Sequence, residues 1–399
     1  MNLQLIPAKL RGTVPAIASK SMAHRLLICA ALGSSPVTLS CPERSRDIEA
    51  TARCLRAMGA DIQATSEGCT LIPGLWRSPC SLPCGESGST LRFLLPVAGA
   101  LGLEAEFSME GRLPQRPLFP LDRELEAHGL TLERPREDLL RIRGQLRPGD
   151  YRLPGNVSSQ FISGLLLALP LLSGTSTLTV TGRLESAPYV GMTLSCLKAF
   201  GISLSGPPYH ISPAPFSGPG ELTVEGDWSN AAFWLAANTL GSDIQVTGLS
   251  RSSLQGDRAI ASLLPKLGSS CLADVSNTPD LVPILAVAAA GRPGETHFVG
   301  AGRLRMKESD RIATVCAMLR SLGVQVREEA HSLTVTGGPL TGGVVDAAGD
   351  HRIAMAAAIA ATAASGPVTL LGAQAVEKSY PRFWQDYRAL GGIAKEVTP

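Results

Sequence analysis

The stretch KSMAHRLLICAALG, residues 20–33, has a polar first turn, is then apolar nearly all round, and ends at a glycine. A helix that is apolar on every side is a buried one. Five more stretches follow the same pattern, at residues 87–102, 158–174, 229–241, 279–291 and 350–366. Most of them are followed by a strand-like run, such as SPVTLS at residues 35–40. The pattern therefore predicts six buried helices, each at the equivalent position of a repeated unit.

A second, amphipathic helix recurs between the buried ones, and each copy closes at a glycine suited to a left-handed C-cap. The closing glycines are Gly59, Gly129, Gly201, Gly268, Gly323 and Gly391. They recur roughly every 70 residues, with one shorter interval, so the chain reads as six versions of one β/α unit. Six units predict two similar domains of three units each, with the buried helices inside and the sheets outside.

Composition limits what the chain can bind. With 399 residues, 44% of them hydrophobic, it can form large cores, and at roughly 100 to 200 residues per domain it predicts two or three domains. A net charge of +2 creates no global field toward nucleic acid or membrane, so an anionic ligand would need a local cluster of cations. The nine cysteines lack metal-binding spacing, which predicts buried thiols in a reducing cytoplasm and no metal site. No apolar run reaches the roughly 18 residues that would cross a bilayer.

The polar first turns of the helices indicate an anion site. If the buried helices lie parallel within each domain, their N-termini present unpaired N–H groups and positive dipole ends on one side, where anions bind. The buried helices contribute Lys20, Ser21, Arg25, Ser87, Gly88, Ser89, Arg92, Ser158, Ser159, Gln160, Asp280, Asp350, His351 and Arg352, and the amphipathic helices add Arg112, Arg116, Ser186, Tyr189, Lys307, Arg311 and Lys378. Cations at helix starts oppose the dipole, so scattered surface charges would not prefer these places.

The charged stretch RLRMKESDRI, residues 303–312, could either bind a ligand or form a solvated surface. We expect it to form the first turn of a helix, where Lys307 and Arg311 would share a face and repel each other. The alternative is a solvated face, which is the commoner role of a run of charges. The serines and aspartates at the helix starts could likewise be ordinary N-caps. The functional interpretation depends on the coincidence of such residues in equivalent places of the six units.

Eight motifs follow one another along the chain in a recognisable order. They are SKSMAHR (19–25), GESGSTLR (85–92), GRLPQRP (111–117), GNVSSQF (155–161), ESAPY (185–189), RMKESDR (305–311), DHRIAM (350–355) and EKSYP (377–381). From end to end the chain resembles the 5-enolpyruvylshikimate-3-phosphate synthase family of enolpyruvyl transferases. The resemblance implies an α/β fold in two inside-out barrel domains, one at 14–226 and the other formed by 1–13 with 227–399, and an active site in the cleft between them.

The resemblance also implies a reaction and roles for individual residues. The enolpyruvyl group of phosphoenolpyruvate would pass to the 5-hydroxyl of shikimate 3-phosphate through a tetrahedral intermediate, with release of phosphate. Positions that match phosphoenolpyruvate ligands in the family are Lys20, Gly88, Arg112, Gln160, Arg311, Arg352 and Lys378. Positions that match shikimate 3-phosphate ligands are Lys20, Ser21, Arg25, Ser158, Ser159, Gln160, Ser186, Asp280 and Lys307. Because the reaction needs an acid and a base, we expect Asp280 at the 5-hydroxyl, Glu308 at the methylene, and Lys20 at the leaving phosphate.

These two ligands would explain the cations, since lysine and arginine can neutralise phosphates without a metal or another cofactor. We expect a monomer that binds neither nucleic acid nor membrane. Arg303 and Glu86 stand where members of the family often have asparagine. One alternative is a UDP-N-acetylglucosamine enolpyruvyl transferase, which uses a loop cysteine that Cys80 and Cys84 match poorly. Another is a non-catalytic protein that binds phosphorylated ligands, although Asp280 and Glu308 argue against it.

Overall fold

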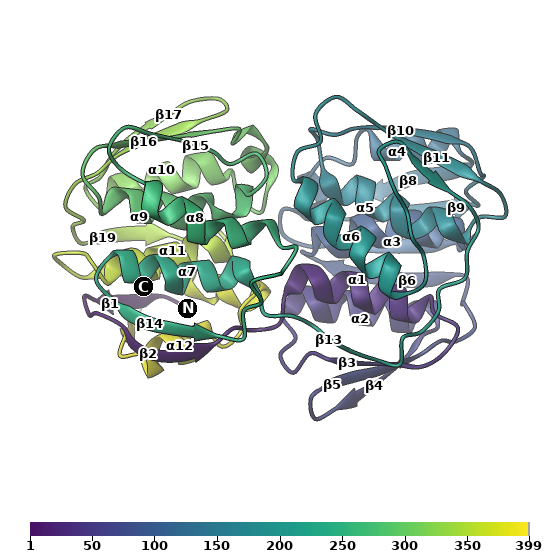
Figure 1. The fold of residues 1–399 in the computed structure, drawn as a ribbon, viewed down its shortest axis with the longest axis horizontal. Helices are drawn as coiled ribbons and strands as arrows, with labels where there is room; N and C mark the ends of the chain where they lie inside the picture. The colour runs from purple at the N-terminus through teal and green to yellow at the C-terminus, as the bar shows by residue number, and fades with distance from the viewer. Residues whose placement is uncertain (398–399) are drawn as a thin grey trace. The chain divides into compact units, whose positions relative to one another are not determined.

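The computed structural model describes residues 1–397, and the chain divides into two compact units (Figure 1). Unit 2 comprises Ala18–Val224, and unit 1 comprises Met1–Ile17 together with the segment from Glu225 onward. The chain therefore passes from one unit to the other after Ile17 and again after Val224, where the sequence-based boundaries were at residues 14 and 227.

Unit 2 holds three copies of the repeated frame. The first contains α1 (Lys20–Ala31), β3 (Val37–Ser40), α2 (Arg46–Met58), β4 (Asp61–Thr65) and β5 (Gly68–Ile72). The second contains β6 (Cys80–Gly85), α3 (Gly88–Ala100), β7 (Ala105–Met109), α4 (Leu121–Ala127), β8 (Leu130–Arg136) and β9 (Leu139–Gly144). The third contains β10 (Asp150–Pro154), α5 (Ser159–Ala168), β11 (Ser176–Thr181), α6 (Ala187–Ala199) and β12 (Tyr209–Ile211), and β13 (Glu221–Thr223) follows it.

Unit 1 repeats the frame and begins with β1 (Leu3–Ile6) and β2 (Arg11–Pro15). After the second crossing come α7 (Trp228–Thr239), β14 (Asp243–Thr247) and α8 (Ile260–Leu263). The next copy contains β15 (Cys271–Asp274), α9 (Val282–Ala290), β16 (Glu295–Val299), α10 (Arg311–Ser321), β17 (Gln325–Glu328) and β18 (Leu333–Thr336). The last contains β19 (Gly343–Asp346), α11 (His351–Ala361), β20 (Val368–Leu371), α12 (Phe383–Ala389) and β21 (Ile393–Glu396).

The sheets follow one pairing rule. The strand before a buried helix pairs in parallel with the strand after it, as β6 does with β7 and β15 with β16. Antiparallel strands then complete the sheets, for example in the order β6-β7-β9-β8. The rule changes at the two crossings, because β2, which precedes α1, pairs with β14, whereas β13, which precedes α7, pairs with β3. The two crossing strands have therefore exchanged partners, and each completes a sheet of the unit in which it lies.

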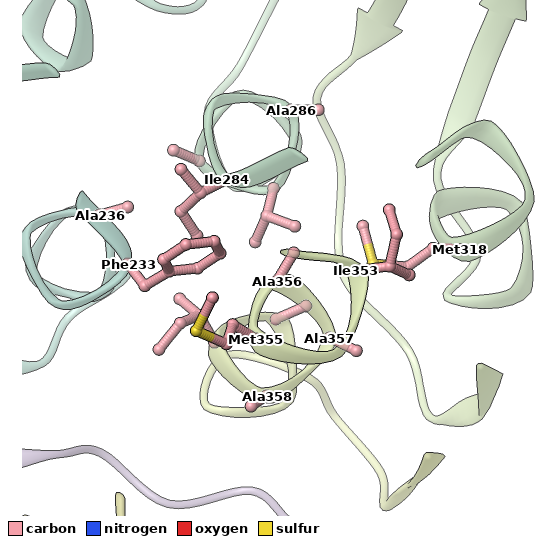
Figure 2. Close-up of a cluster of buried hydrophobic side chains, with 14 of the residues drawn as sticks. Phe233, Ala236, Ile284, Ala286, Met318, Ile353, Met355, Ala356, Ala357 and Ala358 are labelled. Atoms are coloured by element: carbon pink, nitrogen blue, oxygen red, sulfur yellow. The ribbon is translucent and has the colours of Figure 1, made fainter. Parts of the chain in front are cut away.

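The six predicted buried helices are α1, α3, α5, α7, α9 and α11. Every residue of α9 and of α11 is buried, as an all-round apolar pattern requires. The three buried helices of unit 1 contact one another, and Figure 2 shows Phe233 of α7, Ile284 of α9 and Met355 of α11 in this cluster. The alanines of α11 leave room for this close approach (Figure 2). Each unit thus has its helices within and its sheets outside.

All six closing glycines have a φ between +80° and +121°, and five of the six predicted helix ends are confirmed at them. The sixth prediction, a helix that closes at Gly268, is wrong: α8 ends at Leu263, and a 3₁₀ turn, Leu264–Lys266, is followed by an extended Leu267. Pro265 lies in that turn and removes a backbone donor that an α-helix would need. The nine cysteines are free, and all except Cys271 are buried. Among the described residues, no helix has the length and apolar character needed to span a membrane.

Candidate active site

The N-termini of α1 and α2 in unit 2 meet at an ion pair. Lys20, the first residue of α1, lies with its Nζ 2.9 Å from Oδ2 of Asp47. Asp47 is in the first turn of α2, where the helix dipole also favours a carboxylate. Asp47 was not among the predicted site residues, because an aspartate at a helix start has a common structural role that gives no sign of its partner.

Arg25 is buried within unit 2, yet no carboxylate of the described residues pairs with it. Its Nε donates to Oγ1 of Thr193 at 2.7 Å, and its Nη2 donates to the carbonyl of Tyr189 at 3.0 Å and to Oγ of Ser163 at 3.3 Å. Its Nη1 donates to the carbonyl of Ser21. Burial lowers the pKa of Arg25 to about 10, so the guanidinium stays charged at neutral pH. A fixed cation held by neutral oxygens is suited to binding an anion.

The N-termini of α3 and α5 are joined through the side-chain amide of Gln160. Gln160 accepts from Nη1 of Arg92 at 3.0 Å and donates to Oγ of Ser89 at 2.9 Å. A Cβ on Gly88, the first residue of α3, would lie only 2.6 Å from Nη1 of Arg92 and 2.8 Å from Nη1 of Arg116. Two guanidinium groups therefore lie directly beside Gly88. Both arginines were candidates for the anion site, although neither was assigned to a particular substrate.

The remaining predicted residues of unit 2 differ in their surroundings. Ser158 is the N-cap of α5 and accepts from the backbone N–H of Gln160 at 3.3 Å, while Ser159 is the first helical residue. Ser186 precedes α6 with a φ of +54°, a left-handed conformation that a serine adopts only at some cost in energy. Arg112 is exposed at the start of the 3₁₀ turn Leu113–Gln115. The capping role is thus confirmed for Ser158 and does not preclude ligand binding, since a helix N-terminus offers further N–H groups.

A cavity of about 470 Å³ opens next to this 3₁₀ turn, between the segment Pro114–Phe119 and the β8–β9 hairpin. Its lining includes Arg116, Phe119 and Arg134. Arg116 was a candidate for the anion site, whereas none of the residues predicted to bind phosphoenolpyruvate or shikimate 3-phosphate lines the cavity. Arg116 connects it to the surroundings of Gly88.

Three cations of unit 1 converge on Asp280, which lies in the 3₁₀ turn Pro279–Leu281 before α9. Its Oδ1 accepts from Nη1 of Arg311 at 2.7 Å and lies 3.3 Å from Nζ of Lys307. Its Oδ2 lies 3.3 Å from Nη2 of Arg352. Burial raises the pKa of Asp280, but the combined attraction of the three cations outweighs burial and holds that pKa well below its usual range. Asp280 is therefore ionised in the free protein.

Arg311, the first residue of α10, is 1% exposed and reaches two further carboxylates. Its Nη2 donates to Oε2 of Glu308 at 2.7 Å, and its Nε donates to Oδ2 of Asp350 at 2.7 Å. Asp350 is also the N-cap of α11 and accepts from the backbone N–H of Arg352 at 2.9 Å. The alternative role of Asp350 as an N-cap is confirmed, and the same carboxylate also binds the cation of the neighbouring helix.

The expectation that residues 303–312 form one helical turn is wrong. A 3₁₀ turn covers Gly302–Met306, Lys307 is extended, and α10 begins only at Arg311 because Asp310 acts as its N-cap. Lys307 and Arg311 therefore share no helix face. They instead share the carboxylate of Asp280, which removes the repulsion that the helical prediction implied.

Arg352 joins three helix starts of unit 1. Its Nη2 donates to Oγ of Ser229 on α7 at 2.8 Å, and its Nη1 donates to the carbonyl of Asp280 at 3.1 Å. The N-termini of α7, α9, α10 and α11 are thus linked by hydrogen bonds on one side of the unit. Lys378 is buried at the end of the 3₁₀ stretch Ala373–Lys378.

Asp257 was missed by sequence analysis and lies buried near the same cluster, in the turn Gly256–Ala259. Burial and the nearby charge of Asp280 raise the pKa of Asp257 to about 6, although Arg352 and a hydrogen bond with Ser229 oppose that shift. Of Asp257 and Asp280, Asp257 is therefore the carboxyl whose charge changes closer to neutral pH.

The two departures from the family pattern also have defined surroundings. Arg303 donates from Nη2 to the carbonyl of Ser276 at 2.7 Å. Glu86 lies against the backbone of Gly111, where a Cβ would be only 2.6 Å from the Glu86 carboxyl carbon. Gly111 has a φ of +55° and directly precedes Arg112, so Glu86 packs against the segment that carries this predicted ligand.

Comparisons with known proteins agree with one another on the family. The model of EPSP synthase (3-phosphoshikimate 1-carboxyvinyltransferase) matches residues 5–277 and 268–387. The 3-phosphoshikimate 1-carboxyvinyltransferase of Clostridium kluyveri is 40% identical, over 98% of this chain and 97% of its own length. The enzyme of the same name from Clostridium acetobutylicum is 39% identical, over 99% of this chain and 98% of its own.

Solved structures show the same fold. EPSP synthase from Acinetobacter baumannii superposes with a TM-score of 0.82 at 22% identity, over 99% of this chain and all of that one. The enolpyruvyl transferase NikO from Streptomyces tendae superposes with a TM-score of 0.78 at 19% identity, over all of this chain and 99% of its own. The fold is therefore the two-domain inside-out α/β barrel of the enolpyruvyl transferases, and the chain belongs to the EPSP synthase (3-phosphoshikimate 1-carboxyvinyltransferase) family of transferases.

Proposed function

We propose that this chain transfers the enolpyruvyl group of phosphoenolpyruvate to the 5-hydroxyl of shikimate 3-phosphate and releases phosphate. The observation that carries the proposal is the convergence of Lys307, Arg311 and Arg352 on Asp280, at helix N-termini of a chain that belongs to this family. Such a cluster can exchange its internal carboxylate partners for the carboxylates and phosphates of the two substrates.

For phosphoenolpyruvate we propose Arg311, Arg352 and Lys378 in unit 1, and Lys20, Gly88, Arg112 and Gln160 in unit 2. The planar forks of Arg311 and Arg352 suit a carboxylate or a phosphate, whereas lysine offers a point charge. In the free protein both arginines are bound to carboxylates, so these internal partners keep the forks in place until the ligand arrives.

For shikimate 3-phosphate we propose Lys20, Ser21, Arg25, Ser158, Ser159, Gln160 and Ser186 in unit 2, with Asp280 and Lys307 in unit 1. Arg25 supports this assignment, because its partners are neutral oxygens and its charge is left for an anion. The N-terminus of α5 adds the hydroxyls of Ser158 and Ser159 and the positive end of a helix dipole.

The chemistry needs protons moved in both directions. The 5-hydroxyl adds to C2 of phosphoenolpyruvate and loses its proton, while the methylene gains a proton and becomes a methyl group. The tetrahedral intermediate then loses a methyl proton as the C–O bond to phosphate breaks. We assign Asp280 to the hydroxyl and Glu308 to the carbon. Lys20, oriented by Asp47, would protonate or stabilise the departing phosphate oxygen.

The ion pairs of Asp280 also suggest how its basicity changes. Three cations keep its pKa low in the free protein, where it is a weak base. Once substrate anions bind those cations, each attracts Asp280 less, and its affinity for a proton rises. A carboxylate that gains basicity when the substrates are bound is suited to accept the hydroxyl proton at that moment.

The decisive experiment measures phosphate release from phosphoenolpyruvate. We expect release with shikimate 3-phosphate, none with UDP-N-acetylglucosamine, and loss of turnover in Asp280→Asn and Glu308→Gln. Release with the nucleotide sugar would favour the other enolpyruvyl transferase. Calorimetric binding of shikimate 3-phosphate without any turnover would instead indicate a non-catalytic protein. We further propose a monomeric cytoplasmic enzyme without metal or cofactor, and light scattering after size exclusion tests the monomer.

A further inference from the structure

A continuous chain of buried hydrogen bonds runs across three helices of unit 2. Nδ1 of His24 on α1 lies 2.7 Å from Oγ1 of Thr51 on α2, which lies 2.6 Å from Oγ1 of Thr90 on α3. Oγ1 of Thr90 then donates to Oγ of Ser87 at 2.7 Å. All four side chains are completely buried. Ser87 was a candidate for the anion site, but none of the four was assigned to a substrate or to proton transfer.

This series of hydrogen bonds connects two parts of the proposed site. His24 and Thr51 lie one helical turn after Lys20 and Asp47, so α1 and α2 are joined by two successive contacts on the same faces. At its other end, Ser87 is the N-cap of α3 and accepts from the backbone N–H of Thr90 at 3.3 Å. Gly88 is the next residue. The hydrogen bonds therefore connect the start of α3 to α1 and α2, the two helices that carry the Lys20–Asp47 pair.

The donor and the acceptor of each of these hydrogen bonds can be deduced. Each hydroxyl has one hydrogen, and that of Thr90 is given to Ser87. Thr51 must then donate to Thr90, and His24 must donate from Nδ1 to Thr51. Burial lowers the pKa of His24 to about 3, with Asp47 opposing and Lys20 and Arg25 adding to that effect. The imidazole is therefore neutral, with its hydrogen on Nδ1.

Such a network needs a reason, because apolar side chains fill most of this core. Valine or leucine could fill these positions without the cost of burying three hydroxyls and an imidazole. Hydrogen-bonded networks in a low dielectric allow fewer arrangements than apolar contacts do, so they fix the geometry of the elements that they join. Here the joined elements are the helix starts that bear Lys20, Asp47 and Gly88.

We propose that His24, Thr51, Thr90 and Ser87 form a positioning network for phosphoenolpyruvate, which holds the N-terminus of α3 at a fixed place relative to Lys20 without touching the ligand. The proposal rests on the proposed function, because it assumes that Lys20 and Gly88 bind this substrate. The network fixes the start of α3, where Gly88 is a proposed ligand of phosphoenolpyruvate alone, whereas Lys20 is a proposed ligand of both substrates. Arg25, a proposed ligand of shikimate 3-phosphate, is held through a separate set of hydroxyls on Ser163 and Thr193. Loss of the network should therefore affect phosphoenolpyruvate more than shikimate 3-phosphate.

The main test replaces Thr90 by valine, which has the same shape and lacks the hydroxyl. In Thr90→Val we expect the KM for phosphoenolpyruvate to rise about tenfold, because small misplacements of binding groups have effects of that order or larger. The KM for shikimate 3-phosphate should change by less than about twofold. Thr90→Ser keeps the hydroxyl and should restore the parental KM.

A matched control is available in the same unit. Thr38 on β3 and Thr70 on β5 share a hydroxyl–hydroxyl hydrogen bond of 3.0 Å in an outer sheet. Thr38→Val removes a bond of the same kind and should leave both KM values unchanged. Equal KM values for phosphoenolpyruvate in parent and Thr90→Val would overturn the proposal, and so would an equal rise in the KM of both substrates.

A second measurement needs no substrate. Nitrogen-15 NMR of the histidine rings should show His24 with its hydrogen on Nδ1 and no protonation down to about pH 5. A hydrogen on Nε2, or protonation near pH 6.5, would contradict the network even if Thr90→Val does not fold. If the parent shows no turnover, the proposed function fails, whereas altered kinetics without the expected split between substrates reject only the network.

Discussion

Gly88 shows at the scale of one residue how a missing side chain can hold a site open. Both neighbouring guanidinium groups occupy space that a Cβ would fill, so the methyl group of Gly88→Ala must displace the flexible ends of Arg92 and Arg116. We expect normal folding and a KM for phosphoenolpyruvate raised about ten- to a hundredfold, as is typical of a methyl clash worth about 1 to 3 kcal/mol. The matched control is Gly191→Ala in α6, where nothing lies within 4 Å, and its kinetics should equal the parent's. Parental kinetics in Gly88→Ala would mean that the arginines move without consequence.

Asp257 makes a prediction about stability and pH. Its folded-state pKa of about 6 lies above the ordinary value of 3.8, so this carboxyl favours the folded protein below about pH 4 and loses that contribution as the pH rises through 6. Asp257→Asn keeps the shape and cannot ionise. Above pH 7 we expect it to be more stable than the parent by up to about 3 kcal/mol, and near pH 4 the two should be alike. Urea unfolding at both pH values measures this, and a difference independent of pH would refute it.

At the scale of elements, the segment before α10 determines the role of Lys307. Lys307 lies outside the helix and shares Asp280 with Arg311 and Arg352, so the Asp280 carboxylate keeps two partners when Lys307 is replaced. We expect Lys307→Met to change the free energy of unfolding by less than about 1 kcal/mol, since a partly exposed pair contributes little. The kcat/KM for shikimate 3-phosphate should fall about a hundredfold or more, because a charged ligand loses a cation in a partly buried site.

The control for this variant is Arg305→Met in the same segment. Arg305 pairs with Asp310 and Glu328 and has no proposed ligand, so its removal should leave kcat/KM close to that of the parent. Equal losses in the two variants would indicate that the shape of the segment matters and the charge of Lys307 does not. A Lys307→Met variant with normal kinetics would favour the solvated face that a run of charges usually forms.

Elements whose signals are local could be predicted from the sequence, and partners that are distant in the sequence could not. The six buried helices and their neighbours' closing glycines follow from patterns within about 15 residues. The start of α10 was misplaced because Arg305 and Lys307 look helical, whereas the capping hydrogen bond from the N–H of Ala313 to Asp310 decides the boundary. Nothing in the sequence couples Asp350 to Arg311 or Asp47 to Lys20, since those pairs form only when separate helix starts are brought together.

The same contrast holds for the whole molecule. The repeat predicted two sets of three units, but it gave no sign that β2 and β13 exchange partners at the crossings. The residues of a strand do not identify the strand with which it pairs, because that pairing depends on which sheet lacks a strand once the helices have packed. The exchange gives each unit a short strand directly beside its crossing segment, β2 before Ala18 and β13 before Glu225.

The proposed ligands of shikimate 3-phosphate come from both units, and this leads to a prediction for the whole chain. Arg25, Ser158 and Ser159 belong to unit 2, whereas Asp280 and Lys307 belong to unit 1. If one molecule of shikimate 3-phosphate contacts all five, it should slow amide hydrogen exchange at the starts of α1 and α5 and also between Asp280 and Arg311. UDP-N-acetylglucosamine at the same concentration should protect neither region. A carboxylate must lie within hydrogen-bond reach of the proton that it takes. Protection confined to unit 2 would therefore contradict the assignment of Asp280 to the substrate hydroxyl, and the reaction would lack its proposed base.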